Sequence, residues 1–226
     1  MHIVRLSCAA ATVAIAIAAV APAHAAPIAT LFNTGVDAGG LLLADNTIGD
    51  PHYTLITTPG TTTTDIRVRT SDSADPIPPW LADNTTSRWI GPNVSQILNG
   101  DVGDYMFRTT FSLVDLNPVT AMITGRWSMD NTGTEIKLNG TSVVTACTTG
   151  FTAWCNFSIT NNFLSGTNQL DFFISNAGVE PNPIGLRVEM TGTADVPEPA
   201  SLAVLGLGLV GLGAVRRKGR DTGACC

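Results

Sequence analysis

The sequence predicts a single all-β domain, a β-sandwich of the jelly-roll type, between two terminal segments that are not part of the fold. Three observations predict it. Several short segments alternate apolar and polar residues with a period of two. Gly, Asn, Asp and Thr, which favour turns and short strands, are frequent. No stretch between the terminal segments shows the 3.6-residue apolar period of an amphipathic helix.

Five segments are predicted to be strands. Apolar residues alternate with charged or polar ones in residues 66–69, 105–113, 135–138 and 186–190, and residues 171–175 are rich in Phe. We expect the alternating segments to be half-buried, with charged side chains such as Arg187 and Glu189 on the solvent face. The pair Asn139-Gly140, directly after the third alternating segment, predicts a hairpin turn.

The N-terminal residues 1–25 have the features of a secretory signal peptide. One firm positive charge, Arg5, precedes an apolar stretch over 6–20, and Ala23-His24-Ala25 is a small-x-small cleavage pattern. We expect cleavage after Ala25 and export through the inner membrane. The alternative is an uncleaved anchor helix, but the apolar stretch is shorter than the roughly 20 residues of a full span.

The domain between the terminal segments, predicted to cover 26–194, is acidic. Between Ala26 and Val196 there are 7 Lys and Arg against 16 Asp and Glu, a net charge of −9. Such a domain repels nucleic acid and anionic membrane surfaces. The sequence therefore argues against a nucleic-acid partner.

The C-terminal residues 195–226 form a tail of three parts in a fixed order. A Pro-Glu-Pro sequence stops any strand or helix, an apolar, glycine-spaced helix is predicted over 200–215, and a basic cluster follows. Basic residues after an apolar helix place that end in the cytoplasm, so the domain lies outside the inner membrane. The residues concerned are Pro197, Glu198, Pro199, Arg216, Arg217 and Lys218.

This tail resembles the PEP-CTERM sorting domain of Gram-negative bacteria. The resemblance implies recognition by an exosortase, a transpeptidase-like membrane enzyme, and a transient stay of the tail helix in the inner membrane. It also implies transit to the cell surface, the envelope or the extracellular matrix, where exopolysaccharide and biofilm matrix are made. The alternative is an ordinary tail anchor that is not processed.

Cys147 and Cys155 are the two cysteines of the domain. Export to an oxidising compartment favours a disulfide between them, which would close a short loop. A zinc site is a poor alternative, because the domain's single histidine, His52, is far away in the sequence.

Residues 125–192 resemble the C-terminal half of a galactose-binding-like jelly roll. The resemblance rests on three motifs: Trp127-Ser128-Met129-Asp130-Asn131, then Leu138-Asn139-Gly140, then Gly166-Thr167-Asn168-Gln169-Leu170. It implies a β-sandwich, and it raises the expectation of a structural calcium ion. It does not by itself transfer a ligand.

No catalytic residue is predicted. His52 alone could serve as a base, and neither a nucleophile elbow nor a phosphate loop is present. Trp80 and Trp154 are candidate sugar-stacking residues, although large aromatic rings more often cover core edges. Clusters at Asp45-Asn46, Asp50, Asp83-Asn84 and Asp130-Asn131 are candidate calcium sites without an assigned ligand set.

The sequence therefore predicts an exported, non-enzymatic matrix or surface protein that binds carbohydrate such as exopolysaccharide. Two alternatives stay open. One is a secreted hydrolase that uses an unrecognised carboxylate pair. The other is a purely structural surface protein with no small ligand.

Overall fold

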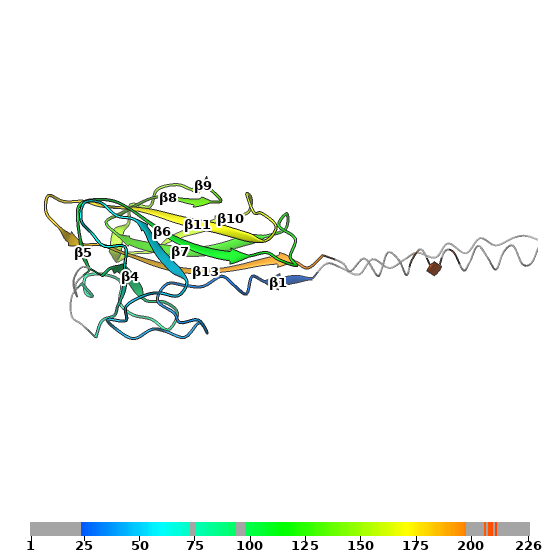
Figure 1. Cartoon of the computed structure of the whole chain (residues 1–226), viewed down its shortest axis with the longest axis horizontal. Helices are drawn as coiled ribbons and strands as arrows, with labels where there is room; N and C mark the ends of the chain where they lie inside the picture. Colours follow the sequence, from blue (N-terminus) through cyan, green and yellow to red (C-terminus); the bar gives the residue numbers. More distant parts are fainter. Residues whose placement is uncertain are drawn as a thin grey trace, which may run out of the picture. The chain divides into compact units, whose positions relative to one another are not determined.

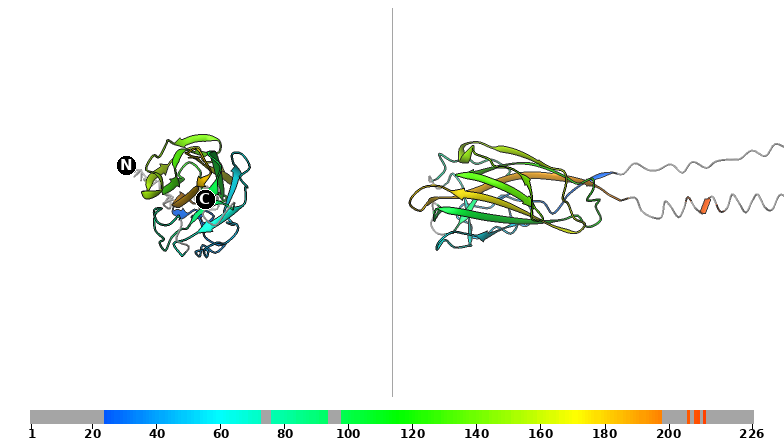
Figure 2. Two further views of the ribbon diagram at one scale, coloured as in Figure 1. Left: turned by 90° about the vertical axis from the view of Figure 1, so that its left-hand side faces the viewer. Right: turned by 90° about the horizontal axis from the view of Figure 1, so that it is seen from above.

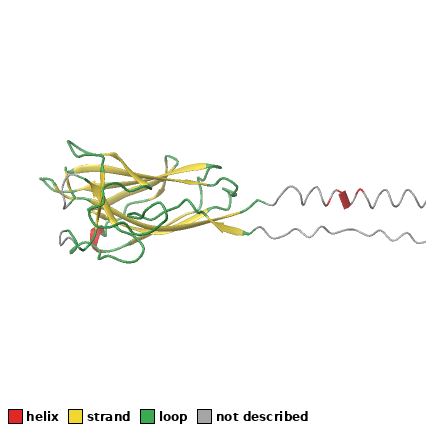
Figure 3. Cartoon of the chain, turned by 60° about the horizontal axis from the view of Figure 1, so that its bottom comes forward, coloured by secondary structure: helices red, strands yellow, loops and turns green. Residues whose placement is uncertain are grey.

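The computed structural model describes residues 24–72, 76–93 and 98–197, together with residues 206, 208, 209 and 211. His24–Pro197 form one compact unit. It consists of strands and loops, with a single 3-10 turn, η1 (Gly150–Thr152), among its described residues (Figure 3). The prediction of an all-β domain is confirmed.

Two antiparallel sheets face each other (Figure 1). The first has the order β10-β7-β13-β4-β3, and β1 also pairs with β13. The second has the order β2-β6-β11-β8-β9, and β5 pairs with β12 separately. The first sheet contains β1 (Ala25–Pro27), β3 (Ile66–Arg69), β4 (Trp89–Pro92), β7 (Met122–Asp130), β10 (Cys155–Ile159) and β13 (Gly185–Asp195). The second sheet contains β2 (Tyr53–Thr57), β6 (Gly103–Ser112), β8 (Thr132–Leu138), β9 (Thr141–Val144) and β11 (Thr167–Asn176). The short pair is β5 (Asn99–Gly100) and β12 (Asn182–Pro183).

The chain passes from one sheet to the other at almost every connection. From β4 onward the main strands alternate between the sheets, except at the β8–β9 hairpin, which stays within the second sheet. Two four-stranded layers, β4-β13-β7-β10 and β6-β11-β8-β9, result from this path. An eight-stranded, two-layer arrangement of this kind is a jelly roll, so the predicted sandwich is confirmed.

The core lies between the sheets and is built around aromatic rings. The Phe172 ring on β11 lies 6.0 Å from the Trp127 ring on β7, centroid to centroid, and 6.3 Å from both Tyr53 and Phe157. Gly133 makes room for this packing, because a Cβ there would lie 2.3 Å from the Trp127 indole. Trp127 is fully buried, as expected of a strand tryptophan in a sandwich core.

All five predicted strands are present, and the Asn139-Gly140 turn joins β8 to β9 with positive φ at both residues. Two of the motifs behind the galactose-binding-like resemblance are hydrogen-bonded to each other. Asn139 Nδ2 donates to Asn168 Oδ1 at 2.8 Å, and Asn139 Oδ1 accepts from the Gln169 amide at 2.9 Å. The two asparagines thus hold the β8–β9 turn against the start of β11.

The expectation of a solvated charged face is wrong for part of the first sheet. Arg187 is fully buried, Glu189 is 8% exposed and Arg69 is 3% exposed. Loop residues cover these positions: Arg187 donates to the carbonyls of residues 81 and 82, and Arg69 pairs with Asp45. Alternation within a strand shows which side chains share a face of the sheet. Whether that face is exposed to solvent depends on the loops that pack on it.

Both ends of the compact unit lie side by side. Ala25 on β1 pairs with Asp195 on β13, and the Val196 amide donates to the His24 carbonyl at 3.1 Å. The chain therefore enters and leaves at the same end of the sandwich (Figure 2). The predicted signal peptide and the predicted helix over 200–215 lie almost wholly outside the described residues. Within the described part of the chain, no helix has the length and apolarity needed to cross a membrane.

Candidate functional site

A groove of about 450 Å³ lies on the outer face of the first sheet. Strands β7, β10 and β13 form its floor, and the segments before β2 and β4 contribute Asn33 and Thr86. Five of the ten lining residues are uncharged and polar, two are the charged residues Arg126 and Glu189, and three are apolar. The lining residues are Asn33, Thr86, Thr124, Gly125, Arg126, Asn156, Phe157, Glu189, Met190 and Thr191.

Strand periodicity explains why polar side chains reach the floor of the groove. On β7 the residues Ile123 and Trp127 point into the core, so Thr124 and Arg126 point outward. On β13 the alternation of Val188 with Glu189 does the same. A sheet that is apolar inside is thereby polar on the face that forms the groove.

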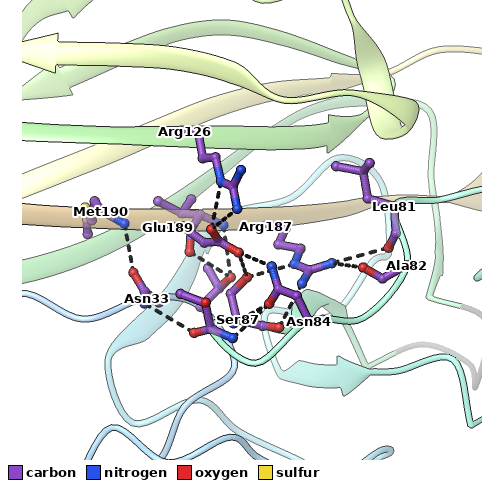
Figure 4. A network of polar contacts seen from close by, with 12 residues as sticks. Asn33, Leu81, Ala82, Asn84, Ser87, Arg126, Arg187, Glu189 and Met190 are labelled. Carbon is purple, nitrogen blue, oxygen red and sulfur yellow. Dashed lines mark hydrogen bonds and ion pairs between the residues drawn. The ribbon is translucent and has the colours of Figure 1, made fainter.

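The carboxylate of Glu189 is the centre of a polar network at the groove (Figure 4). It accepts from Arg126 Nε at 2.7 Å, from Ser87 Oγ at 2.8 Å and from Asn84 Nδ2 at 2.5 Å. Burial raises the pKa of Glu189, but the hydrogen bonds from these three side chains and the charge of Arg126 outweigh it and leave the pKa below its usual range. Glu189 is therefore ionised at neutral pH and fixes the Arg126 side chain, which is 43% exposed.

Arg187 anchors the loop over 81–88 to the sheet (Figure 4). Its guanidinium donates to Ser87 Oγ at 2.8 Å and to the Ala82 and Ser87 carbonyls at 2.8 and 3.0 Å. Burial lowers the pKa of Arg187 to about 10, which still leaves the group charged at neutral pH. Because a buried cation needs such partners, the loop that supplies Thr86 to the groove is held in place.

Trp154 lies beside the groove and packs on cationic side chains. The guanidinium carbon of Arg126 is 4.5 Å from the centroid of the Trp154 ring, and that of Arg187 is 5.3 Å away. The ring is half-buried. Its principal role in this structure is to hold Arg126 from one side, while Glu189 holds it from the other.

Trp80 does not offer a sugar-stacking surface, and the structure corrects this part of the hypothesis. The residue is 3% exposed, its ring lies 4.5 Å from that of Trp89, and its Nε1 donates to Asp130 Oδ2 at 2.9 Å. Trp80, Trp89, Ile77 and Leu98 form a small second core. The segment before Trp80 contains Pro76, Pro78 and Pro79 and forms a loop, and this loop folds its tryptophan inward.

Cys147 and Cys155 form the predicted disulfide, with their Cα atoms 6.1 Å apart. The bridge closes the loop that contains η1 and Trp154. It therefore restricts the loop carrying the ring that packs on Arg126. Sequence reasoning found this bridge from the export signal and the cysteine spacing.

The Asp and Asn clusters proposed for calcium have separate protein partners. Asp50 accepts from the backbone amides of Gly35, His52 and Tyr53, and Asp83 accepts from Ser71. Within the described ranges no three His, Cys, Asp or Glu side chains are grouped as a metal site would require. The calcium hypothesis stays a prediction without assigned ligands.

His52 packs flat on Phe32, with ring centroids 3.6 Å apart, and its Nε2 lies 2.8 Å from the Asp37 carbonyl oxygen. These contacts are those of a structural histidine. Of the sorting residues, Pro197 ends the described range, and Glu198, Pro199, Arg216, Arg217 and Lys218 lie outside it.

The groove itself was not predicted. Its residues come from β7, β10, β13 and two loops, and nothing in their sequence spacing brings them together. The alternation in β13 did place Glu189 opposite the core, which is the one sequence signal that pointed to this face.

A jelly roll with a groove on one outer face is thus the class of protein that the structure defines. Residues 195–218 match the PEP-CTERM protein-sorting motif, so the chain carries this motif, as the tail predicted. The motif implies an exported protein that is membrane-anchored or associated with the cell surface in Gram-negative bacteria. No curated protein matches the chain in sequence.

Two solved structures are similar to this chain at low sequence identity and low TM-score. One is a family 35 carbohydrate binding module from Clostridium thermocellum, at 14% identity and a TM-score of 0.30, covering 65% of this chain and 89% of that one. The other is an exo-β-1,3-galactanase from Phanerochaete chrysosporium, at 12% identity and a TM-score of 0.22, covering 75% of this chain and 29% of that one.

Proposed function

We propose that this chain is an exosortase-processed surface protein whose sandwich binds carbohydrate, in particular exopolysaccharide, in the groove on its first sheet. The observation that carries the proposal is the lining of the groove. The Thr124 hydroxyl and the Asn156 amide group line the groove together with an Arg126 guanidinium that is already fixed in position. Asn33 also lines the groove, but its side chain donates to the Thr86 carbonyl and accepts from the Met190 amide. Sugar hydroxyls are recognised by donors and acceptors of this kind, and a fixed donor loses little entropy on binding.

The charges of the groove favour a hydroxyl-rich ligand over a strongly charged one. Arg126 and Glu189 are paired, with Nη2 and Oε2 2.6 Å apart, so the pair contributes little net charge. The guanidinium has five N–H donors and uses part of them on Glu189, which leaves donors on its exposed side for a ligand.

The arrangement gives less support to the hydrolase alternative. Glycoside hydrolysis generally uses two carboxyl groups placed on either side of the scissile bond. Among the described residues that line the groove, Glu189 alone is acidic, and both of its oxygens accept hydrogen bonds within the protein. We therefore propose a binding role without catalysis.

Calorimetric titration of the full chain in detergent with fragments of the host exopolysaccharide tests the proposal. We expect Asn156→Ala to weaken binding about tenfold, which corresponds to about 1.4 kcal/mol. Thr110→Ala, an exposed change on β6 of the other sheet, is the matched control and should bind like the wild type. Equal affinities of wild type and Asn156→Ala, or no binding to any glycan offered, would count against the groove.

A further inference from the structure

The end of the sandwich where the chain enters and leaves exposes several large apolar side chains. We call it the exit end; it comprises the β6–β7 loop, the β10–β11 loop, the start of β7 and the end of β13. Among the residues of His24–Pro197 that the structure describes, ten large apolar side chains are exposed, and half of them lie on it. They are Val114 (64% exposed), Val119 (86%), Met122 (43%), Leu164 (54%) and Val196 (43%).

Backbone contacts place these residues at one end. The Asn117 amide donates to the Asp195 carbonyl, which holds the β6–β7 loop against the end of β13. Met122 pairs with Thr193, two residues before Asp195. The Leu113 amide donates to the Gly166 carbonyl, which brings the loop carrying Leu164 to the same end.

The covalent path of the chain says what this end faces. Pro197 is the last residue of the compact unit, and the apolar segment predicted to cross the membrane begins at Ala200. Three extended residues reach only about 10 Å. The apolar segment of the predicted signal peptide, over 6–20, is separated by three residues from His24, whose carbonyl accepts from the Val196 amide. Before processing, both apolar segments therefore attach at the exit end.

We propose that the exit end is a membrane-contacting surface: while the tail is still attached, its aliphatic side chains insert into the headgroup region of the bilayer. Aliphatic groups bury about 5–10 Å into that region when a surface lies on a membrane. The acidic residues Asp115 and Asp195 lie at the same end, so the matching surface is one of zwitterionic lipid. The proposal rests on insertion of the tail and is independent of carbohydrate binding.

This contact would have a consequence for processing. It would hold the start of the sorting motif, which overlaps the end of β13 at Asp195, at the depth of the headgroups. The motif would then be presented to a membrane enzyme at a fixed height rather than on a freely moving stalk.

The test uses the full chain in phosphatidylcholine vesicles, with Cys8, Cys225 and Cys226 replaced by serine and the Cys147–Cys155 bridge kept. An environment-sensitive fluorophore is attached at Val119→Cys or at Leu164→Cys. Val179→Cys is the matched control: Val179 is 94% exposed and follows the end of β11 that pairs with the start of β6, so it lies at the opposite end.

Brominated lipid should quench the labels at 119 and 164 at least about twice as strongly as the label at 179, because quenching needs approach to the depth that an interfacial surface reaches. Equal quenching at all three positions would overturn the proposal. So would labels at 119 and 164 that are shielded from water but not quenched by the lipid, since another protein segment or a second copy would then cover this end. A chain that does not float with the vesicles would remove the premise and overturn the proposal as well, whatever its affinity for sugars.

Discussion

Asp130 provides the sharpest test of the energetics of this fold. Its carboxyl group is buried beside the Trp80 indole, and no cationic side chain contributes to the shift of its pKa. Oδ2 accepts from Trp80 Nε1 at 2.9 Å, while Oδ1 is buried and has no hydrogen-bond partner. Burial raises the pKa of Asp130 from 3.8 to about 6, and the bond from Trp80 lowers it by less.

The direction in which stability changes with pH follows from proton binding to Asp130 in the folded and unfolded states. A carboxyl whose pKa is higher in the folded state than in the unfolded chain binds its proton more tightly when folded. Its favourable contribution is complete below the unfolded pKa of 3.8 and is lost as the pH rises through about 6. The difference between these two pKa values corresponds to about 3 kcal/mol.

We therefore expect Asp130→Asn to gain stability relative to the wild type as the pH rises. The variant keeps an oxygen for Trp80 and removes the buried charge. The free energy of unfolding of the variant minus that of the wild type should rise by about 2–3 kcal/mol between pH 4 and pH 8. Urea unfolding followed by tryptophan fluorescence measures it, and the other carboxyl groups cancel in the difference.

Asp115→Asn is the control, since Asp115 is exposed and its positive φ suits asparagine equally well. Its difference from the wild type over the same pH range is the baseline for the Asp130→Asn curve. A flat difference curve for Asp130→Asn, or one that falls as the pH rises, would refute the reasoning.

Three further changes test the disulfide, the buried Arg187 and the packing of the core. Replacing Cys147 and Cys155 together by serine should lower the free energy of unfolding by about 2–3 kcal/mol, because the bridge closes a short loop. Urea unfolding under non-reducing conditions measures this loss, and a smaller loss would speak against a formed bridge. Arg187→Met should lower the free energy of unfolding by about 3 kcal/mol or more, since it leaves the buried acceptors of the covering loop without a donor. A loss under about 1 kcal/mol would show that water takes the place of the guanidinium. Gly133→Ala should cost about 1–3 kcal/mol by pushing on the Trp127 ring, and an unchanged melting temperature would show that the ring can move.

Local chemistry explains which parts of the fold could be predicted. The five strands follow from alternation, and the β8–β9 turn follows from Asn139-Gly140, because both signals involve residues close in the sequence. The disulfide follows from export and from two cysteines eight positions apart. The order of strands in the two sheets is not encoded in this way, since partners such as β1 and β13 are more than 150 residues apart.

The sequence did not predict which side chains a distant loop would bury. The sequence makes Trp80 a candidate for stacking on a sugar and predicts that Arg187 faces solvent. Both are buried because the segment 76–88 folds over the first sheet. That packing depends on contacts such as Trp80 with Asp130, fifty positions apart. The groove depends on the same packing, because Thr86 of this loop lines it beside residues of β7, β10 and β13.

The two proposals concern different faces of one sandwich, and this separation follows from the strands themselves. The groove uses the outward side chains of β7, β10 and β13, which point perpendicular to the sheet. The exit end consists of loops that connect the strands at one end of the sandwich, so it faces along the strand direction. A jelly roll tethered by its last strand therefore leaves the side of its sheet open toward the surroundings while its end contacts the membrane. Blocking the groove should leave the labels at 119 and 164 unchanged, and detaching the tail should leave sugar affinity unchanged.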